Sequence, residues 1–377
     1  GFRKAKVNTR YFEDLINQII HKPTNFIEKV KLGKTYWKAN NNDNMKFNAI
    51  VGNPPYQVMD GGGTGSSAIP VYDKFVDIAK KVKPEYLSMI MPSKWYSGGR
   101  GLDQFRESML SDTRMHKLFD YDDSRDCFQG VDIAGGICYF LWNYNYDGSC
   151  NVVNFRKNNK ITTKRHLNEF DSFIRDGEAI HIINKVKELG ENNFSTIVFS
   201  SKPFGLRSYV VGEKEASKDS ITLYGSQGIS YVKVENITVN SELIGKWKVI
   251  MSKTSAEHAG QSDKDGKKKV VSRIEVLAPN VICTESYLLL SVFENESEAN
   301  NLKSYVQSRF FRFLLSTILL TQNIAKDKFQ FIPLQNFTST SDIDWSQSLA
   351  DIDRQLYAKY GLSEEEVAFI EGMIKGM

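Results

Sequence analysis

Apolar residues in the first 150 positions switch between helical and strand-like spacing. Near the start, stretches 11–20 and 24–30 have apolar residues at helical spacing, and the polar run 40–44 then breaks the pattern. Residues 47–52 are apolar and rich in β-branched side chains, which predicts a short strand. The run Asn53-Pro54-Pro55 ends this strand, because neither proline can donate a hydrogen bond to a neighbouring strand.

Strands and helices continue to alternate after the prolines. The later predicted elements are a helix at 71–83, a strand at 86–91, a loop at 92–101, a helix at 102–110, and strands at 115–121 and 136–142. Such alternation predicts an α/β domain in which helices cover a parallel sheet. The polar, turn-rich stretch 143–148 suggests a domain edge, so we place one domain at 1–150 and a second at 151–377.

The second half has a different pattern, which predicts an α+β domain. One helix is expected at 178–189, and short strand-like runs occur at 247–251 and 281–284 between glycine-containing loops. Towards the end, 299–320 reads as one helical stretch and 363–375 as a capped helix with acidic residues in its first turn.

Composition indicates an ordinary soluble protein with a large core. Of the 377 residues, 41% are apolar and 25% charged, and the formal net charge is only +4. That charge is compatible with a locally basic surface but does not by itself indicate nucleic-acid binding. No apolar run reaches the length of a membrane span and no secretory signal is recognisable, so we expect a cytoplasmic protein.

The cysteines and histidines predict neither a disulfide framework nor a metal site. The four cysteines are far apart, without the two-residue spacing of zinc ligands. The five histidines show no paired spacing with one another or with carboxylates.

The tetrapeptide Asn53-Pro54-Pro55-Tyr56 carries the strongest chemical signal. The exocyclic N6 of adenine is a poor nucleophile because its lone pair is delocalised into the ring, so an enzyme that methylates it must hold the amine between two hydrogen-bond acceptors. The Asn53 side-chain oxygen and the Pro54 carbonyl are suitable acceptors, and proline fixes the backbone that presents them. Tyr56 offers an aromatic face on which a flipped base can stack.

The alternative is that these four residues form an ordinary turn after a strand. Their position favours a functional role, because α/β sheets place ligand sites at the carboxyl ends of their strands.

Here the sequence resembles the γ-class adenine-N6 DNA methyltransferases of bacterial type II restriction-modification systems. Residues 47–56 match the catalytic motif of that family. Residues 89–95 look like its strand-then-proline motif, and 127–131 followed by 137–142 look like its later aromatic motif. The motifs occur in family order over roughly residues 45–145. The rest of the chain is similar to the target-recognition domain that follows in such enzymes.

The resemblance implies a fold, a cofactor and a partner. It implies a Rossmann-like S-adenosylmethionine-dependent methyltransferase sheet, incomplete at its N-terminus, followed by an α+β target-recognition domain that binds double-stranded DNA. It also implies that Phe128 stacks on the flipped adenine opposite Tyr56. The alternative for Phe128 is a core side chain beside a glycine turn.

The sequence departs from the family where the cofactor should bind. The glycine-rich cofactor loop and the acidic residue for the ribose, which the family places before the catalytic motif, are absent from residues 1–46. The run 61–67 lies on the other side of that motif, and we expect it to be a surface turn. The chain begins with Gly1 rather than methionine, so we expect a fragment in which Asn53 forms only the edge of the S-adenosylmethionine site.

Candidate DNA contacts come from one loop near the motif and from basic residues of the second half. These candidates are Lys94, Trp95, Arg100, Lys202, Arg207, Lys253, Lys267, Lys268 and Lys269. The alternative for each group is a solvated loop without a ligand.

Two other functions stay open from the sequence. One is a DNA-binding specificity module without catalysis. The other is a protein glutamine-N5 methyltransferase, which uses the same four residues but ends soon after its last sheet strand, whereas this chain continues for more than half its length. A nuclease domain or subunit in the parent system is a further partner to test.

Overall fold

The computed structural model describes residues 11–33, 37, 45–59, 68–99, 101–156, 159–256 and 265–377. The chain divides into two compact units, Gly1–Phe173 and Ile174–Met377, and each is described here by itself. None of the described helices is long and apolar enough to cross a membrane.

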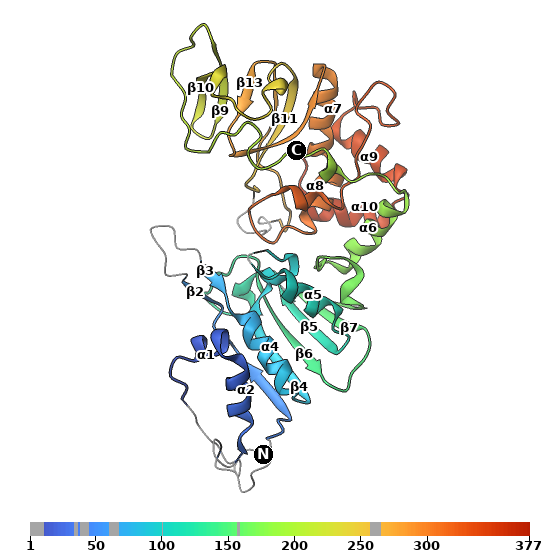
Figure 1. The fold of residues 1–377 in the computed structure, drawn as a ribbon. Coiled ribbons are helices and arrows are strands. Elements are labelled where there is room, and N and C mark those ends of the chain that lie inside the picture. Colours follow the sequence, from blue (N-terminus) through green and yellow to red (C-terminus); the bar gives the residue numbers. More distant parts are fainter. Residues whose placement is uncertain are drawn as a thin grey trace. The chain divides into compact units, whose positions relative to one another are not determined.

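The first unit is built on a six-stranded sheet with the order β1-β4-β6-β5-β7-β8 (Figure 1). Its strands are β1 (Ala49–Gly52), β4 (Tyr86–Pro92), β5 (Met115–Tyr121), β6 (Ile137–Asn143), β7 (Cys150–Arg156) and β8 (Asn159–Arg165). The first four lie where the hydrophobic pattern predicts strands. The sheet and its helices confirm the predicted α/β class.

The sheet is mixed, which corrects the prediction of a parallel one. β1 pairs with β4 in parallel and β5 with β7 in parallel, but β6 runs antiparallel between β4 and β5. Parallel neighbours need a crossover, which is usually a helix. The connection from β5 to β6 contains only the short 3₁₀ turn η2 (Ser124–Asp126), so the chain turns back beside β5.

The boundary predicted near residue 150 also needs correction, because the first unit continues to Phe173. The polar stretch 143–148 is the turn between β6 and β7, where the Tyr146 amide donates to the Asn143 carbonyl at 3.0 Å. Turn-forming residues mark any tight connection, inside a domain as well as between domains.

Helix α4 (Tyr72–Val82) packs against β4 of the sheet (Figure 1). Helix α5 (Asp103–Ser111) contacts α4. The rings of Tyr72 and Phe105 meet edge to face with centroids 6.0 Å apart. Helices α1 (Leu15–His21) and α2 (Pro23–Lys31) pack against α4, and a small hairpin joins β2 (Gln57–Met59) to β3 (Ala68–Pro70). The run 61–67 lies outside the described residues.

A buried carboxylate ties three of these elements together. The side chain of Asp112, 6% exposed, accepts hydrogen bonds from Arg114 Nε at 2.7 Å and from Trp142 Nε1 at 2.9 Å. Lys80 of α4 completes the cluster at 2.9 Å. Burial alone would raise the pKa of Asp112, but these three partners outweigh it and hold the pKa well below its usual range.

The second unit has separate sheets and helices, an α+β arrangement (Figure 1). One sheet has the order β10-β9-β13 and the other β12-β11-β14. The strands are β9 (Ser220–Gly225), β10 (Gly228–Lys233), β11 (Trp247–Ser252), β12 (Ile274–Leu277), β13 (Val281–Cys283) and β14 (Tyr287–Phe293). The helices are α6 (Gly177–Glu188), α7 (Glu296–Gln307), α8 (Arg309–Ser316), α9 (Leu349–Lys359) and α10 (Glu364–Met373).

The long helix predicted at 299–320 is two helices. Ser308 has extended dihedrals, φ −60° and ψ 150°, and its side chain caps α8 by accepting from the Phe311 amide. The predicted cap of the last helix is confirmed, because Ser363 and Glu366 form a capping box at the start of α10.

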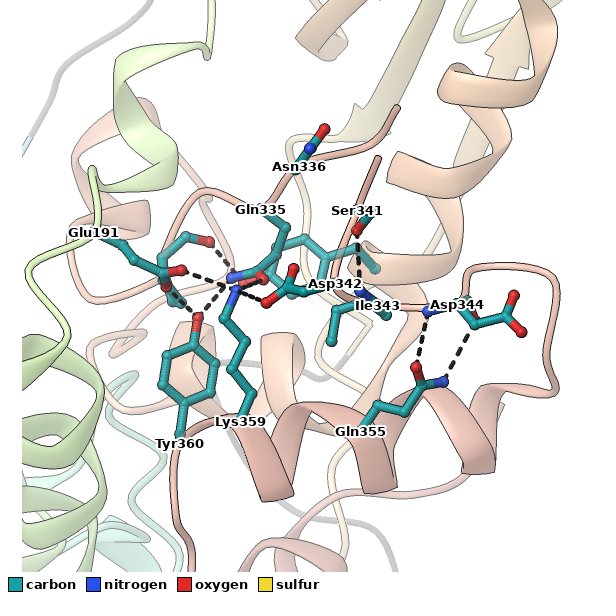
Figure 2. A network of polar contacts seen from close by, with 12 residues as sticks. Glu191, Gln335, Asn336, Ser341, Asp342, Ile343, Asp344, Gln355, Lys359 and Tyr360 are labelled. Atoms are coloured by element: carbon teal, nitrogen blue, oxygen red, sulfur yellow. Dashed lines mark hydrogen bonds and ion pairs between the residues drawn. The ribbon is translucent and has the colours of Figure 1, made fainter. Parts of the chain in front are cut away.

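A partly buried polar network joins α9 to the segment after α6 (Figure 2). Tyr360 donates to Glu191 and accepts from Gln335 Nε2 at 2.6 Å. Lys359 contacts Glu191 and Asp342, each at 2.9 Å, and donates to Gln335 at 2.8 Å. Burial opposes the charge of Lys359, but its hydrogen bonds to Asp342 and Glu191 outweigh that cost and raise its pKa.

Replacing Asp112 with Asn should lower the free energy of unfolding by about 2–3 kcal/mol, because Lys80 loses a buried partner. The folded-state pKa of Asp112 is depressed, so its contribution is present above about pH 4 and is lost as pH falls below that value. The free energy of unfolding, measured in urea between pH 3 and 7, should therefore change less with pH in the variant than in the wild type. Asp147→Asn, at an exposed site, is the control, and equal effects of the two variants would contradict the prediction.

Lys359→Met should lower the free energy of unfolding by about 2 kcal/mol, because Glu191 and Gln335 keep their burial but lose a charged donor. Thermal unfolding followed by circular dichroism measures the change. Lys246→Met removes an exposed ion pair with Glu294 and should cost less than about 1 kcal/mol. A Lys359 variant no less stable than the Lys246 variant would rule out a stabilising role for the network.

Candidate active site

Residues Asn53 to Tyr56 lie at the carboxyl end of β1. Since β1 and β4 are parallel, the ends of both strands reach the same edge of the sheet, where α/β proteins place ligands. The Tyr56 carbonyl accepts a hydrogen bond from the Val71 amide at 3.2 Å. This bond fixes the tetrapeptide to the start of α4.

A pocket of about 440 Å³ opens beside the tetrapeptide. It is lined by Asn53, Pro54, Pro55, Tyr56, Phe128, Val131 and Ile133. The last three come from the connection between β5 and β6, more than 70 positions along the chain. The structure therefore brings Phe128 to the same pocket as the four residues of the motif.

Two acceptors in this pocket are uncommitted. The side chain of Asn53 is exposed. Among the described residues, neither the Asn53 side chain nor the Pro54 carbonyl makes a hydrogen bond. A planar amine that enters the pocket can therefore donate to both without displacing a protein partner.

Tyr56 and Phe128 give the pocket aromatic walls, and both are half-buried. Burial raises the pKa of the Tyr56 hydroxyl, and the nearby thiols of Cys127 and Cys138 add to this effect. The ring is therefore neutral at physiological pH. A neutral aromatic face suits stacking on a nucleobase.

Sequence reasoning missed Ser124, which organises the connection that carries Phe128. Its hydroxyl donates to the Val131 carbonyl at 2.7 Å and accepts from the Ile133 amide at 2.8 Å. Serine is common in loops, so its type gave no signal. Gly136 is a sequence signal close to this connection. A Cβ at position 136 would lie 2.1 Å from the Tyr121 carbonyl oxygen, so a glycine is needed where the two ends of the connection meet.

Of the predicted DNA contacts in the first unit, Trp95 has to be corrected. It is completely buried, its Nε1 donates to Cys138 Sγ at 3.3 Å, and its ring packs on Phe105 at 5.8 Å. A core side chain of this kind does not reach a DNA backbone. Lys94, beside it in the 3₁₀ turn η1 (Ser93–Ser97), is half-buried, and Arg100 lies outside the described residues.

In the second unit, three predicted cations lie near one another. Arg207 lies 3.7 Å from the Glu285 carboxylate, and Lys253 is close enough to Glu285 and to Lys202 for both charges to act on it. Lys253 donates to the Ser201 carbonyl at 2.6 Å, and burial lowers its pKa.

Lys253 also lines a pocket that sequence reasoning missed. This pocket has a volume of about 580 Å³. Its lining is Ser195, Phe199, Ser201, Lys253, Leu288, Asn323, Ile324, Ala325, Lys326 and Asp327. The lining comes from four distant stretches of sequence, which is why no local pattern indicated it.

The other three predicted cations lie apart from this cluster. Lys267 donates to the Glu371 carbonyl at 2.9 Å, the Lys268 amide donates to Met373, and the Lys269 carbonyl accepts from Arg312. These bonds tie the segment to α8 and α10, so at least part of its role is structural.

The lining of the pocket beside the tetrapeptide does not provide a complete cofactor site. S-adenosylmethionine needs donors and acceptors for its ribose and for its amino-acid end, but the pocket lining has no charged side chain. In the described part of the chain, helices α1 and α2 precede β1 and no strand does. The lining fits an aromatic base with an amine, and it does not fit the whole cofactor. Nor does the described part contain a cluster of three or more His, Cys, Asp or Glu that could hold a metal ion.

The pocket and its motif can be compared with known proteins. Residues 1–128 match the Eco57I restriction-modification methylase family. The Eco57I match ends at Phe128, the aromatic wall of the pocket. It confirms the resemblance to restriction-modification adenine methylases that the motifs indicated.

A curated relative agrees with the Eco57I methylase match. An uncharacterized adenine-specific methylase of Mycoplasma pneumoniae is 34% identical over 147 residues, which are 38% of this chain and 33% of that protein. The chain thus spans about a third of the relative's length.

Solved structures give weaker similarities to this chain. The type IIL restriction-modification enzyme MmeI in complex with DNA has a TM-score of 0.42 at 8% identity, over 85% of this chain and 56% of that one. The nuclease-deletion mutant of the type ISP enzyme LlaGI, with a DNA substrate mimic, gives 0.38 at 11% identity over 83% and 41%. The type IIG endonuclease BpuSI gives 0.33 at 13% identity over 86% and 52%.

Proposed function

We propose that this chain supplies the adenine pocket and the DNA-reading part of a site-specific DNA adenine-N6 methyltransferase of a restriction-modification system. The observation that carries the proposal is the pocket, where the acceptors of Asn53 and Pro54 lie beside the rings of Tyr56 and Phe128. The Eco57I-family match over the same residues supports it.

In this proposal, Asn53 and Pro54 hold the amine of the target adenine. The Asn53 side-chain oxygen accepts one N6 hydrogen and the Pro54 carbonyl accepts the other. With both hydrogens engaged, the nitrogen lone pair is turned out of conjugation with the ring and towards the methyl donor. When S-adenosylmethionine is bound, its sulfonium S–CH₃ bond would break as the N–CH₃ bond forms, leaving the neutral thioether. The two acceptors would stabilise the positive charge on nitrogen, and the excess proton would pass to solvent.

Tyr56 and Phe128 receive the base. A base taken out of the duplex loses stacking worth a few kcal/mol, and two aromatic walls return part of it. Because Tyr56 is uncharged and half-buried, its ring adds apolar contact without a desolvation cost for a phenolate.

The second unit is the DNA-reading part in this proposal. Lys202, Arg207 and Lys253 would contact backbone phosphates, which fix register and carry no sequence information. Glu285 pairs with Arg207 and lies close enough to Lys253 for its charge to act on that side chain. Lys94 of the first unit is a further candidate phosphate contact. Lys267 to Lys269 are weaker ones, because the Lys267 side chain and the Lys268 backbone are bonded to α10 and the Lys269 backbone to α8.

S-adenosylmethionine supplies the methyl group in this chemistry. Asn53 would border its site, and the remaining cofactor contacts would come from polypeptide outside the described residues. The described residues of this chain therefore act on the adenine side of the reaction.

Isothermal titration of the 377-residue chain with S-adenosylmethionine should give no low-micromolar binding, because the described pocket lining offers no partner for the ribose or the amino-acid end. The same titration of the full-length protein is the positive control. A low-micromolar dissociation constant for the chain alone would contradict an incomplete cofactor site.

Asn53→Ala in the full-length protein should lower methyl transfer by roughly 100-fold or more, because one of two acceptors for the amine is lost. DNA binding should be largely unchanged. Methyl transfer is measured as tritium incorporated into unmethylated plasmid DNA, and DNA binding by an electrophoretic mobility shift. Asn48→Ala, at the other end of the same strand, is the matched control. Undiminished methylation by the Asn53 variant would refute the proposed reaction.

A further inference from the structure

We propose that Ser124 is a positioning residue that fixes the Phe128 wall of the adenine pocket. The inference rests on the proposed function, because it concerns the geometry of that same pocket. Ser124 itself does not line the pocket and would act only through the residues that do.

Ser124 holds the connection between β5 and β6 through buried hydrogen bonds. It is 1% exposed. Its hydroxyl donates to the Val131 carbonyl at 2.7 Å and accepts from the Ile133 amide at 2.8 Å. Its own carbonyl accepts from the Phe128 amide at 2.8 Å. Each of the three pocket residues contributed by this connection is therefore bonded directly to Ser124.

These bonds replace the regular structure that the connection lacks. Between Tyr121 and Ile137 the chain has only the single 3₁₀ turn η2. Its two ends are already fixed, because the Gly136 carbonyl accepts from the Ser93 amide at 3.0 Å and Gly136 packs on the Tyr121 carbonyl. The middle of the connection, which carries Phe128, has Ser124 as its anchor.

The hydroxyl is suited to this role because it satisfies a donor and an acceptor at once. Alanine at position 124 would leave the Val131 carbonyl and the Ile133 amide without these partners, and the segment would relax to regain hydrogen bonds. The Phe128 carbonyl accepts from the Val131 amide at 3.2 Å, so a shift of Val131 would move Phe128 even though the Phe128 amide keeps its bond to the backbone carbonyl of residue 124.

Such a shift should affect the chemical step more than DNA affinity. A flipped base held about 1 Å from its reactive position loses rate steeply, while contacts to the DNA backbone are unaffected. Ser124→Ala in the full-length protein should therefore lower kcat by roughly 10- to 100-fold. The KM for DNA should change by less than about threefold, as expected for a loss confined to the reacting geometry.

A matched control separates positioning from general destabilisation. Ser308, also fully buried, donates to the Tyr305 carbonyl at 2.7 Å and accepts from the Phe311 amide at 3.1 Å, away from the pocket lining. Ser308→Ala makes the same chemical change and should lower Tm without lowering kcat at a temperature where the protein stays folded. A kcat loss as large in Ser308→Ala as in Ser124→Ala would overturn the inference.

A double-mutant cycle tests whether Ser124 acts through Phe128. If it does, Ser124→Ala combined with Phe128→Ala should be little slower than Phe128→Ala alone, so the two losses should not multiply. A double variant whose loss of kcat equals the product of the two single losses would overturn the inference. The second readout is the fluorescence of 2-aminopurine at the methylated position of an oligonucleotide, which should be less quenched in Ser124→Ala than in the wild type.

One further variant, together with the Asn53→Ala variant described above, keeps every outcome decisive. Ser124→Cys keeps the side-chain shape with a weaker donor and acceptor. It should have an intermediate kcat, and it replaces Ser124→Ala in the cycle if the alanine variant does not fold. A wild-type kcat in Ser124→Cys would overturn the inference while the proposed function stands. Continued methylation by Asn53→Ala would overturn both.

Discussion

The inability of two consecutive prolines to donate backbone hydrogen bonds is the constraint on which the pocket depends. Pro54 and Pro55 stop β1 at the edge of the sheet, and they do so beside the parallel end of β4. Because the strand cannot continue, Asn53 and the Pro54 carbonyl keep their acceptors free of ladder partners. The Tyr56 carbonyl then accepts a hydrogen bond from the Val71 amide, which holds the tetrapeptide at the start of α4. The end of the strand thus also leaves these two acceptors without protein partners among the described residues.

The part of the site that sequence could predict is the part that is local. Asn53 to Tyr56 are contiguous, and both their chemistry and their place after a strand can be read within ten residues. Phe128 could be placed only through the order of family motifs, since nothing near it in sequence refers to residue 56. Its role in stacking is still a proposal. Ser124 could not be found, because its value lies in the bonds it makes across the connection and not in its residue type.

The errors of prediction have a common physical origin. Trp95 follows a lysine and precedes a glycine-rich stretch, which reads as an exposed loop, but burial is decided by packing on Phe105 and Cys138. The direction of β6 depends on whether a helix crosses between β5 and β6, and hydrophobic spacing does not show strand direction. Strands β7 and β8 extended the first unit beyond the expected boundary for the same reason. Whether a segment forms a strand depends mainly on its own residues, whereas the partner and direction of that strand depend on the rest of the fold.

The antiparallel placement of β6 has a consequence for how such a pocket diversifies. Adjacent paired strands lie roughly 4.8 Å apart, so the two ends of the β5–β6 connection start as near neighbours whatever its length. The Phe128 wall of the pocket is therefore carried by a connection whose two ends are set by the sheet and whose interior lies outside it. A change in the length or aromatic content of residues 122–136 would alter the size and shape of the pocket while the strands that hold its ends stay paired.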